Sequence, residues 1–338
     1  MSEQEKSNAL RSVTITTKQE MPIALGTFEY IAGIDPRETW APFSDDEMDV
    51  EEFEKMRTKH MDIIKSQEST KEFQDKLKEM LQESLTLYQG IMSANGDVFK
   101  PYIEGRMFNF VLGMPRTGGT TVYQGLSDAY GWPWEKLLLS MTHNFMPNGG
   151  HILSDPTAEF DMGWRLPWNF NNLVFELSQF LVYINNVAPD SEHIFIKSTA
   201  LSYAVKLLNF LFADKANYFI TVRHPGAITM TSGKEDITRE DHMETMAMWS
   251  NLYSSMIREC RPLGRMRVVE YGAGMTEIIN LAFEQTKVGE RIEETSFFEL
   301  DEYDKDFYES DAVKRMFDYV KTSWELFDID FPIPDKCI

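Results

Sequence analysis

The pattern of apolar and polar positions divides the chain into a helical first part and a later part built differently. Residues 48–92 carry apolar side chains at helical spacing and predict one or two amphipathic helices. Residues 12–17 are β-like, and residues 44–57 are strongly acidic. We therefore expect residues 1–100 to form an acidic, mainly helical flank on a main domain.

Short apolar runs rich in β-forming residues alternate with helical stretches in the later part. The runs predict four buried strands, at Met107–Leu112, His193–Ile196, Tyr218–Val222 and Met266–Val269. The helical stretches between them are 120–130, 200–213 and 242–259. This alternation predicts an α/β domain over residues 101–338, with helices on both faces of a parallel sheet.

A glycine-rich turn, Gly113-Met-Pro-Arg-Thr-Gly-Gly-Thr-Thr121, connects the first predicted strand to a helix. In such a turn, backbone N–H groups, hydroxyls and the helix N-terminus can surround phosphate oxygens. The spacing of Gly113 and Gly118 mimics a Walker A loop, but Gly119 stands where a nucleoside triphosphatase needs lysine. The basic residue is instead Arg116, inside the loop. The pattern predicts a phosphate-binding loop; a turn without a ligand is the alternative.

Charge and cysteine content limit the classes of partner. The 338 residues include 54 acidic and 33 basic side chains, for a net charge of −21. This acidity argues against nucleic acid and anionic membranes, and it favours cationic ligands, although solubility alone would also explain it. No apolar run approaches the roughly 20 residues of a membrane span, and no signal peptide is evident. With only Cys260 and Cys337, the chain has no disulfide framework or multi-cysteine zinc site, which indicates a cytoplasmic setting.

The glycine-rich turn and two later blocks resemble sulfotransferases that use 3′-phosphoadenosine 5′-phosphosulfate (PAPS), of the bacterial small-molecule branch. Residues 115–118, Pro-Arg-Thr-Gly, match the family's 5′-phosphosulfate loop, although Gly119 replaces its first threonine. Residues 193–198 resemble the strand that ends in Lys-Ser, and residues 216–225 the strand that ends in arginine. Residues 268–271 are a weaker match to a strand whose tyrosine lies near the adenine. The resemblance covers roughly residues 107–275.

The resemblance implies a role for each matched residue. The 5′ end of the donor would be bound by Arg116, Thr117, Gly118, Gly119, Thr120 and Thr121. Arg223 would bind the 3′-phosphate with a hydroxyl eight positions later, at Thr231 or the adjacent Ser232, and Tyr271 would lie near the adenine. Lys197 would stabilise the leaving oxygen. The family needs no metal ion for this reaction.

The catalytic base is not identified by this match, because no histidine follows Lys197 as it does in many members. Glu135 occupies a region comparable to that of a catalytic glutamate in other sulfotransferases, and His143 and His151 lie in the same irregular segment. We regard Glu135 and His143 as the leading candidates, with His151 as a third.

The function expected from the sequence is transfer of a sulfuryl group from PAPS to a hydroxyl or amine of a small molecule, within a P-loop-type α/β domain. Residues 132–190 are expected to help form the acceptor pocket, and their aromatic side chains suit an aromatic or cationic natural product. These aromatic residues could instead fill a core. Two other functions remain open: an atypical P-loop kinase, which would need Mg²⁺, and a non-catalytic nucleotide-binding protein.

Overall fold

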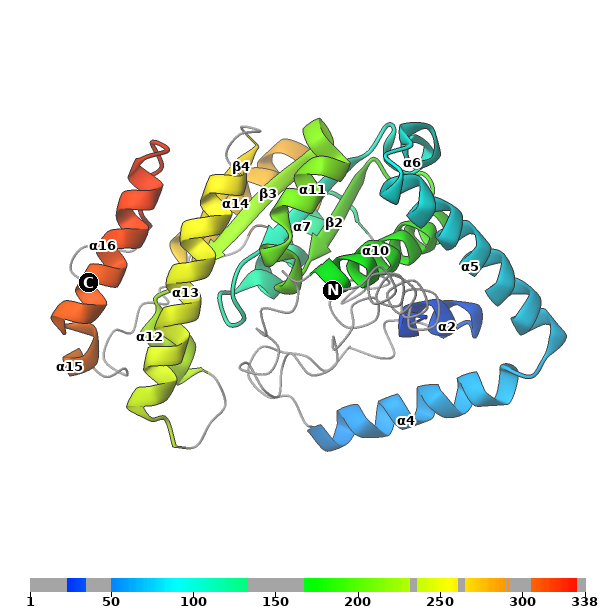
Figure 1. The fold of residues 1–338 in the computed structure, drawn as a ribbon, viewed down its shortest axis with the longest axis horizontal. Coiled ribbons are helices and arrows are strands. Elements are labelled where there is room, and N and C mark those ends of the chain that lie inside the picture. Colours follow the sequence, from blue (N-terminus) through cyan, green and yellow to red (C-terminus); the bar gives the residue numbers. More distant parts are fainter. Residues whose placement is uncertain are drawn as a thin grey trace, which may run out of the picture. The chain divides into compact units, whose positions relative to one another are not determined.

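The computed structural model describes residues 23–34, 50–132, 167–231, 236–260, 265–289, 291 and 305–332 (Figure 1). These residues fall into two compact units. The first contains the described residues up to 102 together with 167–189, and the second contains the rest. The sequence predicts a single boundary near residue 100. In the structure the first unit also contains residues 167–189, which follow the first strand in the chain.

The first unit is built from helices. They are α2 (Leu25–Ile31), α4 (Val50–Gln67), α5 (Lys71–Met92), α6 (Gly96–Ile103) and α10 (Pro167–Val187). The helical periodicity of residues 48–92 corresponds to α4 and α5. They are separate helices because Thr70 caps the start of α5, where its hydroxyl accepts a hydrogen bond from the Phe73 N–H at 3.3 Å.

Helix α10 accounts for the poor periodicity of residues 132–190. Every residue from 173 to 184 is buried, so this part of the helix has no polar face to produce an amphipathic pattern. Phe175 packs edge-on against Tyr88 of α5, with ring centroids 5.9 Å apart. On the side of α2, Gln179 accepts hydrogen bonds from the Ala24 N–H and the Thr27 hydroxyl, at 2.9 and 3.2 Å.

A carboxyl group is buried within the apolar stretch of α10. Glu176 is only 2% exposed, and its Oε2 has no hydrogen-bond partner in the part of the chain that the structure describes. Burial raises the pKa of Glu176 well above its ordinary value. The group therefore favours its neutral form in the folded protein.

We expect the free energy of unfolding to decrease less with rising pH in Glu176→Gln than in the wild type. Above the ordinary pKa of a glutamate, the unfolded protein releases the proton that the folded protein keeps on Glu176. The free energy of unfolding therefore decreases with pH until the raised pKa of the folded state is reached. Within that window the loss is about 1.4 kcal/mol per pH unit. Urea unfolding measured from about pH 5 to about pH 8 should therefore show a shallower decline in the variant. The exposed Glu68→Gln is the matched control, and parallel curves for Glu176→Gln and the wild type would contradict the prediction.

The second unit contains a four-stranded sheet in which all neighbouring strands are parallel. Its strands are β1 (Met107–Leu112), β2 (His193–Lys197), β3 (Ala216–Val222) and β4 (Met266–Glu270), in the spatial order β2-β1-β3-β4. The prediction of four parallel strands is confirmed, with boundaries that differ by two residues or fewer. From β1 the chain proceeds to one edge of the sheet, and from β3 it proceeds to the other.

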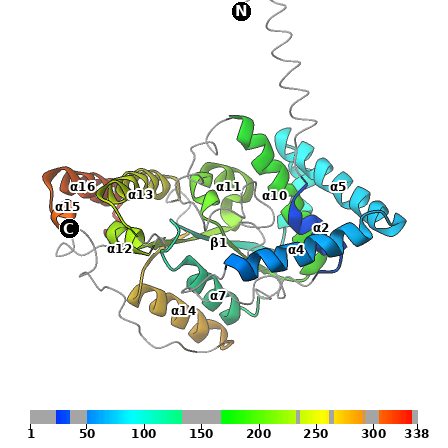
Figure 2. The ribbon, with the colours of Figure 1, turned by 90° about the horizontal axis from the view of Figure 1, so that it is seen from below.

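Helices cover both faces of this sheet, as expected (Figure 2). On one face lie α7 (Gly119–Ala129) and α14 (Ala273–Thr286), and on the other lie α11 (Val205–Phe212) and α13 (Arg239–Cys260). Helix α16 (Asp311–Glu325) packs against α13. The shorter elements are η3 (Ala200–Tyr203), η4 (Ala213–Lys215), α12 (Pro225–Met230) and α15 (Lys305–Tyr308). The described chain is thus a mixed α/β structure that is mostly helical.

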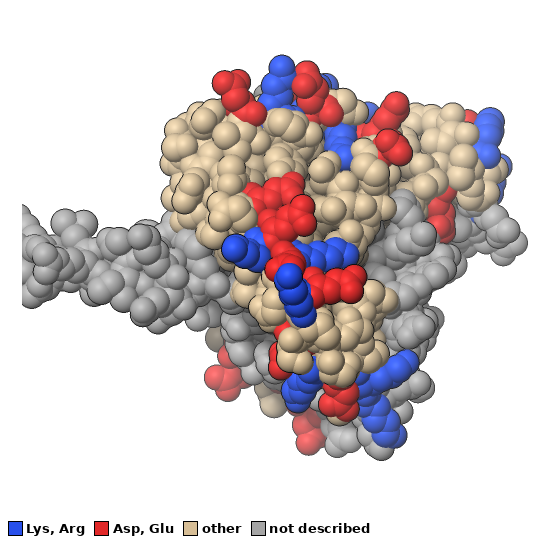
Figure 3. Space-filling view, turned by 90° about the vertical axis from the view of Figure 1, so that its right-hand side faces the viewer, with Lys and Arg blue, Asp and Glu red and all other residues tan. Residues whose placement is uncertain are grey.

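The charged side chains on the face shown in Figure 3 are of both signs. Described Lys and Arg residues are interspersed there with Asp and Glu, and they do not form an extended basic patch. A long polyanion would need such a patch. Separately, none of the helices within the described ranges combines the length and apolar character needed to cross a membrane.

Candidate functional site

The carboxyl ends of the parallel strands bring most of the predicted donor-site residues to one edge of the sheet. Strand β1 leads into the glycine-rich loop, β2 ends at Lys197, and β3 is followed by Arg223. Strand β4 leads to Tyr271, whose N–H donates to the carbonyl of Val222 at 2.9 Å. Because β1 and β3 are neighbours whose connections run to opposite sides, their ends form a switch point of the kind where open parallel sheets bind ligands.

The loop between β1 and α7 is held in an unusual backbone conformation. Gly118 is the N-cap of α7 with φ 77°, and a Cβ atom there would lie 2.9 Å from Cδ2 of Tyr271, too close for a side chain. Arg116 also has a positive φ, 63°, which is rare and costly for a residue other than glycine. The loop leads directly to the first N–H groups of α7, which have no acceptor within the helix. This arrangement suits an anion.

The threonines of the loop differ in what their side chains can do. Thr117 is fully buried, and its hydroxyl lies 2.7 Å from both the Met114 carbonyl oxygen and the Thr221 hydroxyl. Any contact of Thr117 with a nucleotide would therefore come from its backbone N–H. Thr120 and Thr121 lie half-buried in the first turn of α7.

Arg223 lies against the loop. Its Nη1 donates to the Arg116 carbonyl oxygen at 3.1 Å and lies 3.5 Å from the hydroxyl oxygen of Thr231, the residue eight positions later. The guanidinium carbon is 4.0 Å from the ring centroid of Tyr271, a cation–π contact. The structure therefore brings Arg223, Thr231, Tyr271 and the loop together; Ser232 lies outside the described residues.

The electrostatics of this edge favour an added negative charge. Burial lowers the pKa of Arg223, Tyr271 opposes this shift, and the positive charge of Arg116 lowers the pKa further. The Nε of Arg223 is buried and has no hydrogen-bond partner within the described ranges. Glu270 ends β4, and burial raises the pKa of its carboxyl. An anion would offset the repulsion between the two arginines and supply an acceptor.

Lys197 reaches the same loop from the neighbouring strand. It is half-buried and pairs with Val111 in the sheet register. A Cβ atom at Gly119 would lie 3.7 Å from the Cε of Lys197, so this side chain passes over the start of α7. The next residue, Ser198, is buried and accepts a hydrogen bond from the Leu201 N–H at 3.1 Å, which turns the chain into η3. The strand end and this turn together fix the position of Lys197.

The expected base and most of the expected acceptor segment lie outside the described residues. This applies to Glu135, His143 and His151, so the base stays a prediction. Among the described aromatic residues in the segment, Trp132, Phe175, Phe180 and Tyr183 are buried. Trp132 lies near Phe195 of β2, with ring centroids 6.5 Å apart. For these four residues, the alternative of filling a core applies.

Two residues behind the loop were missed by the sequence analysis. The Ser202 hydroxyl accepts from the Gly113 N–H at 2.9 Å, and the Tyr253 hydroxyl accepts from the Met114 N–H at 3.2 Å. They lie 89 and 139 residues from these partners along the chain. No local motif marks them, because their role depends on the sheet bringing distant segments together.

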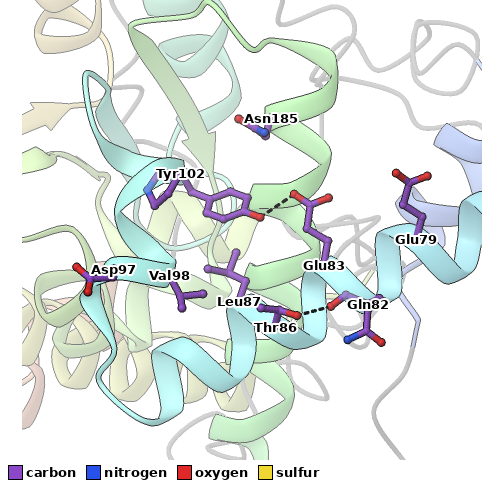
Figure 4. Close-up of a pocket in the computed structure, with 10 residues that line it drawn as sticks. Glu79, Gln82, Glu83, Thr86, Leu87, Asp97, Val98, Tyr102 and Asn185 are labelled. Carbon is purple, nitrogen blue, oxygen red and sulfur yellow. Dashed lines mark hydrogen bonds between the residues drawn. The ribbon is translucent and has the colours of Figure 1, made fainter.

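A separate pocket lies within the first unit, between α5, α6 and the end of α10 (Figure 4). Its volume is about 540 Å³. The charged residues that line it are Glu79, Glu83 and Asp97, and Tyr102 donates a hydrogen bond to Glu83 at 2.6 Å. Because this charged lining is acidic, the pocket is unsuited to a polyanionic nucleotide.

The candidate site is therefore the edge formed by the loop, Lys197, Arg223, Thr231 and Tyr271. Within the described residues, no cluster of His, Cys, Asp and Glu is arranged to hold a metal ion. Comparison of the chain with protein-family models, with curated proteins and with solved structures found no match.

Proposed function

We propose that the protein is a sulfotransferase that transfers a sulfuryl group from PAPS to a hydroxyl or amine of a small-molecule acceptor, in a P-loop-type α/β domain. The observation that carries this proposal is the contact of Arg223 with the carbonyl of Arg116. It places two cationic residues at the ends of neighbouring strands, with Lys197 at the end of the third. Such a concentration of positive charge, in a chain of net charge −21, supports an anionic ligand.

Two separate basic side chains, Arg116 and Arg223, support a ligand that carries negative charge at two ends. The loop, Arg116 and the N-terminus of α7 would bind the 5′ end of the nucleotide through backbone N–H groups and a guanidinium. Arg223, with Thr231 and Ser232, would bind the 3′-phosphate. The stacking of Tyr271 on Arg223 offers an aromatic face beside that phosphate, which suits the adenine.

The reaction would be an in-line displacement at sulfur. When bound, PAPS supplies an activated sulfuryl group. The acceptor oxygen or nitrogen forms a bond to sulfur, the bond from sulfur to the 5′-phosphate oxygen breaks, and the nucleotide product PAP leaves. Arg116 and the loop N–H groups would stabilise charge on the sulfuryl oxygens, and Lys197 would stabilise the leaving oxygen. The acceptor proton passes to a base, for which Glu135, His143 and His151 are the candidates.

The acceptor we propose is a small cationic or aromatic compound rather than a sulfated polymer. The net charge of −21 would repel a polyanionic glycan. The aromatic residues of the segment 132–190, apart from the buried ones that fill a core, would line the pocket, as aromatic faces bind both flat molecules and cations. A screen of phenols, alcohols, alkaloids and polysaccharides with labelled PAPS tests this, and a glycan as best acceptor would contradict it.

We expect PAP to bind more tightly than ATP or GTP, and turnover to survive EDTA. The reason is that Gly119 stands where triphosphate-binding loops place lysine, while Arg223, beside the loop, offers an additional anion contact. Isothermal titration with the three nucleotides, followed by turnover assays with and without EDTA, measures both. Mg²⁺-dependent phosphoryl transfer from ATP would indicate a kinase. Tight PAP binding without turnover of any acceptor would indicate a non-catalytic nucleotide-binding protein.

A further inference from the structure

We propose that helix α13 positions both ends of the donor site, through Trp249 and Tyr253. This inference rests on the proposed function, because it concerns the same nucleotide site. The two residues are four apart on the helix, so they lie on one face, and both are fully buried. One contacts the segment that follows β3, and the other contacts the glycine-rich loop.

Tyr253 connects the loop to strand β3. Its hydroxyl donates to the Thr221 carbonyl oxygen at 2.6 Å and accepts from the Met114 N–H at 3.2 Å. Burial raises the pKa of the Tyr253 hydroxyl, so it stays protonated and can serve as donor and acceptor at once. The Met114 N–H is therefore held at the back of the loop, which leaves the N–H groups that follow to face a ligand.

Trp249 acts in the same way on the other end of the site. Its indole N–H donates to the carbonyl oxygen of Arg223 at 3.0 Å. The backbone of Arg223 is thereby fixed while its guanidinium contacts the Arg116 carbonyl and the ring of Tyr271. Without the indole N–H, this carbonyl would lose its partner and the arginine could shift.

Helix α13 is itself held by α16. The indole N–H of Trp324 donates to the Tyr253 carbonyl oxygen at 3.2 Å. The ring of Phe317 lies 5.3 Å from that of Trp249 and 5.5 Å from that of His224, the residue after Arg223. The two positioning residues therefore belong to a closely packed layer rather than to a mobile helix face. The separation of the loop from Arg223 is set by one turn of a supported helix, which preorganises the site for a ligand with two anionic ends.

The test compares two nucleotides that differ only in the 3′-phosphate, PAP and adenosine 5′-phosphate, on two conservative variants of the full chain. Tyr253→Phe should weaken both nucleotides by a similar factor, about fivefold, because it loosens the loop that would bind their common 5′-phosphate. Trp249→Phe should weaken PAP by about fivefold and adenosine 5′-phosphate by clearly less, because it loosens Arg223 directly and the loop only through the contact of Arg223 with the Arg116 carbonyl. The ratio of the affinity for PAP to that for adenosine 5′-phosphate should therefore fall in Trp249→Phe and stay as in the wild type in Tyr253→Phe.

The controls separate positioning from general destabilisation. Met256→Leu changes packing on the same buried helix without removing a hydrogen bond to the site, and it should leave both affinities unchanged. Trp249→His retains a ring N–H donor and should recover part of the PAP preference. If Trp249→Phe and Tyr253→Phe weaken both nucleotides in the same ratio, or weaken neither, the inference is overturned while the proposed function stands. If the wild type binds neither nucleotide, the proposed function itself fails.

Discussion

Replacing Lys197 by methionine is expected to lower turnover at saturating PAPS by about 100-fold to 1,000-fold. Methionine keeps a side chain of similar length at the end of β2 but removes the ammonium group that passes over the start of α7. In the proposed reaction, negative charge grows on the oxygen between sulfur and the 5′-phosphate. A cation aimed at that oxygen stabilises the transition state more than the bound donor. Turnover should therefore fall more than PAP affinity.

The matched control for this variant is Lys206→Met. Lys206 lies on α11, and its Nζ pairs with Glu259 of α13 at 3.3 Å on the surface. It loses the same charge without altering the strand ends, so turnover should stay within about twofold of the wild type. If Lys197→Met folds, binds PAP and still turns over at a rate close to the wild type, Lys197 has no catalytic role. A loss of PAP binding as large as the loss of turnover would make it a binding residue only.

The strands and the loop could be predicted from the sequence because their signals are local. A strand buried on both faces of a parallel sheet is a nearly continuous apolar run, and 107–112 and 218–222 have this form, each with one polar residue, Asn109 and Thr221. The loop can be predicted because glycine and proline residues stand between such a run and a helix. Helix α10 gave no comparable signal, because burial on every side removes the period of 3.6 residues, and Glu176, Ser178 and Gln179 are buried within its middle instead of forming a polar face.

The candidate site could be predicted only in part, for a different reason. A motif indicates which residues lie near a phosphate, but not which atom of each residue faces it. Thr117 illustrates this, since its hydroxyl is used within the protein and only its N–H remains. Tyr253 and Trp249 reach the site through side-chain contacts with backbone groups 139 and 26 residues away. Such contacts depend on tertiary packing, so they cannot be predicted from the identities of the residues alone.

Replacing Arg223 by alanine is expected to weaken PAP binding by about 2 kcal/mol or more, roughly 30-fold, because a charge-assisted contact to the 3′-phosphate is lost. Adenosine 5′-phosphate lacks that phosphate, so its affinity should change much less. Arg223→Lys keeps the charge but loses the flat guanidinium that stacks on Tyr271 and donates to the Arg116 carbonyl. Its affinity for PAP should lie between those of the wild type and the alanine variant. Isothermal titration of the three proteins with both nucleotides measures these effects.

The control for the alanine variant is Arg267→Ala, which removes an exposed arginine from β4 and should leave both affinities unchanged. Titrations at low and high salt separate two explanations for a weaker PAP affinity in Arg223→Ala: long-range attraction and direct contact with the phosphate. If Arg223 acts only through long-range attraction, Arg267→Ala should also weaken PAP, and both effects should fade at high salt. If Arg223 contacts the phosphate directly, most of its effect should persist, because a half-buried pair is screened less. Unchanged PAP binding in a folded Arg223→Ala protein would remove the 3′-phosphate from this end of the sheet, and with it the reason to prefer PAPS over another anionic donor.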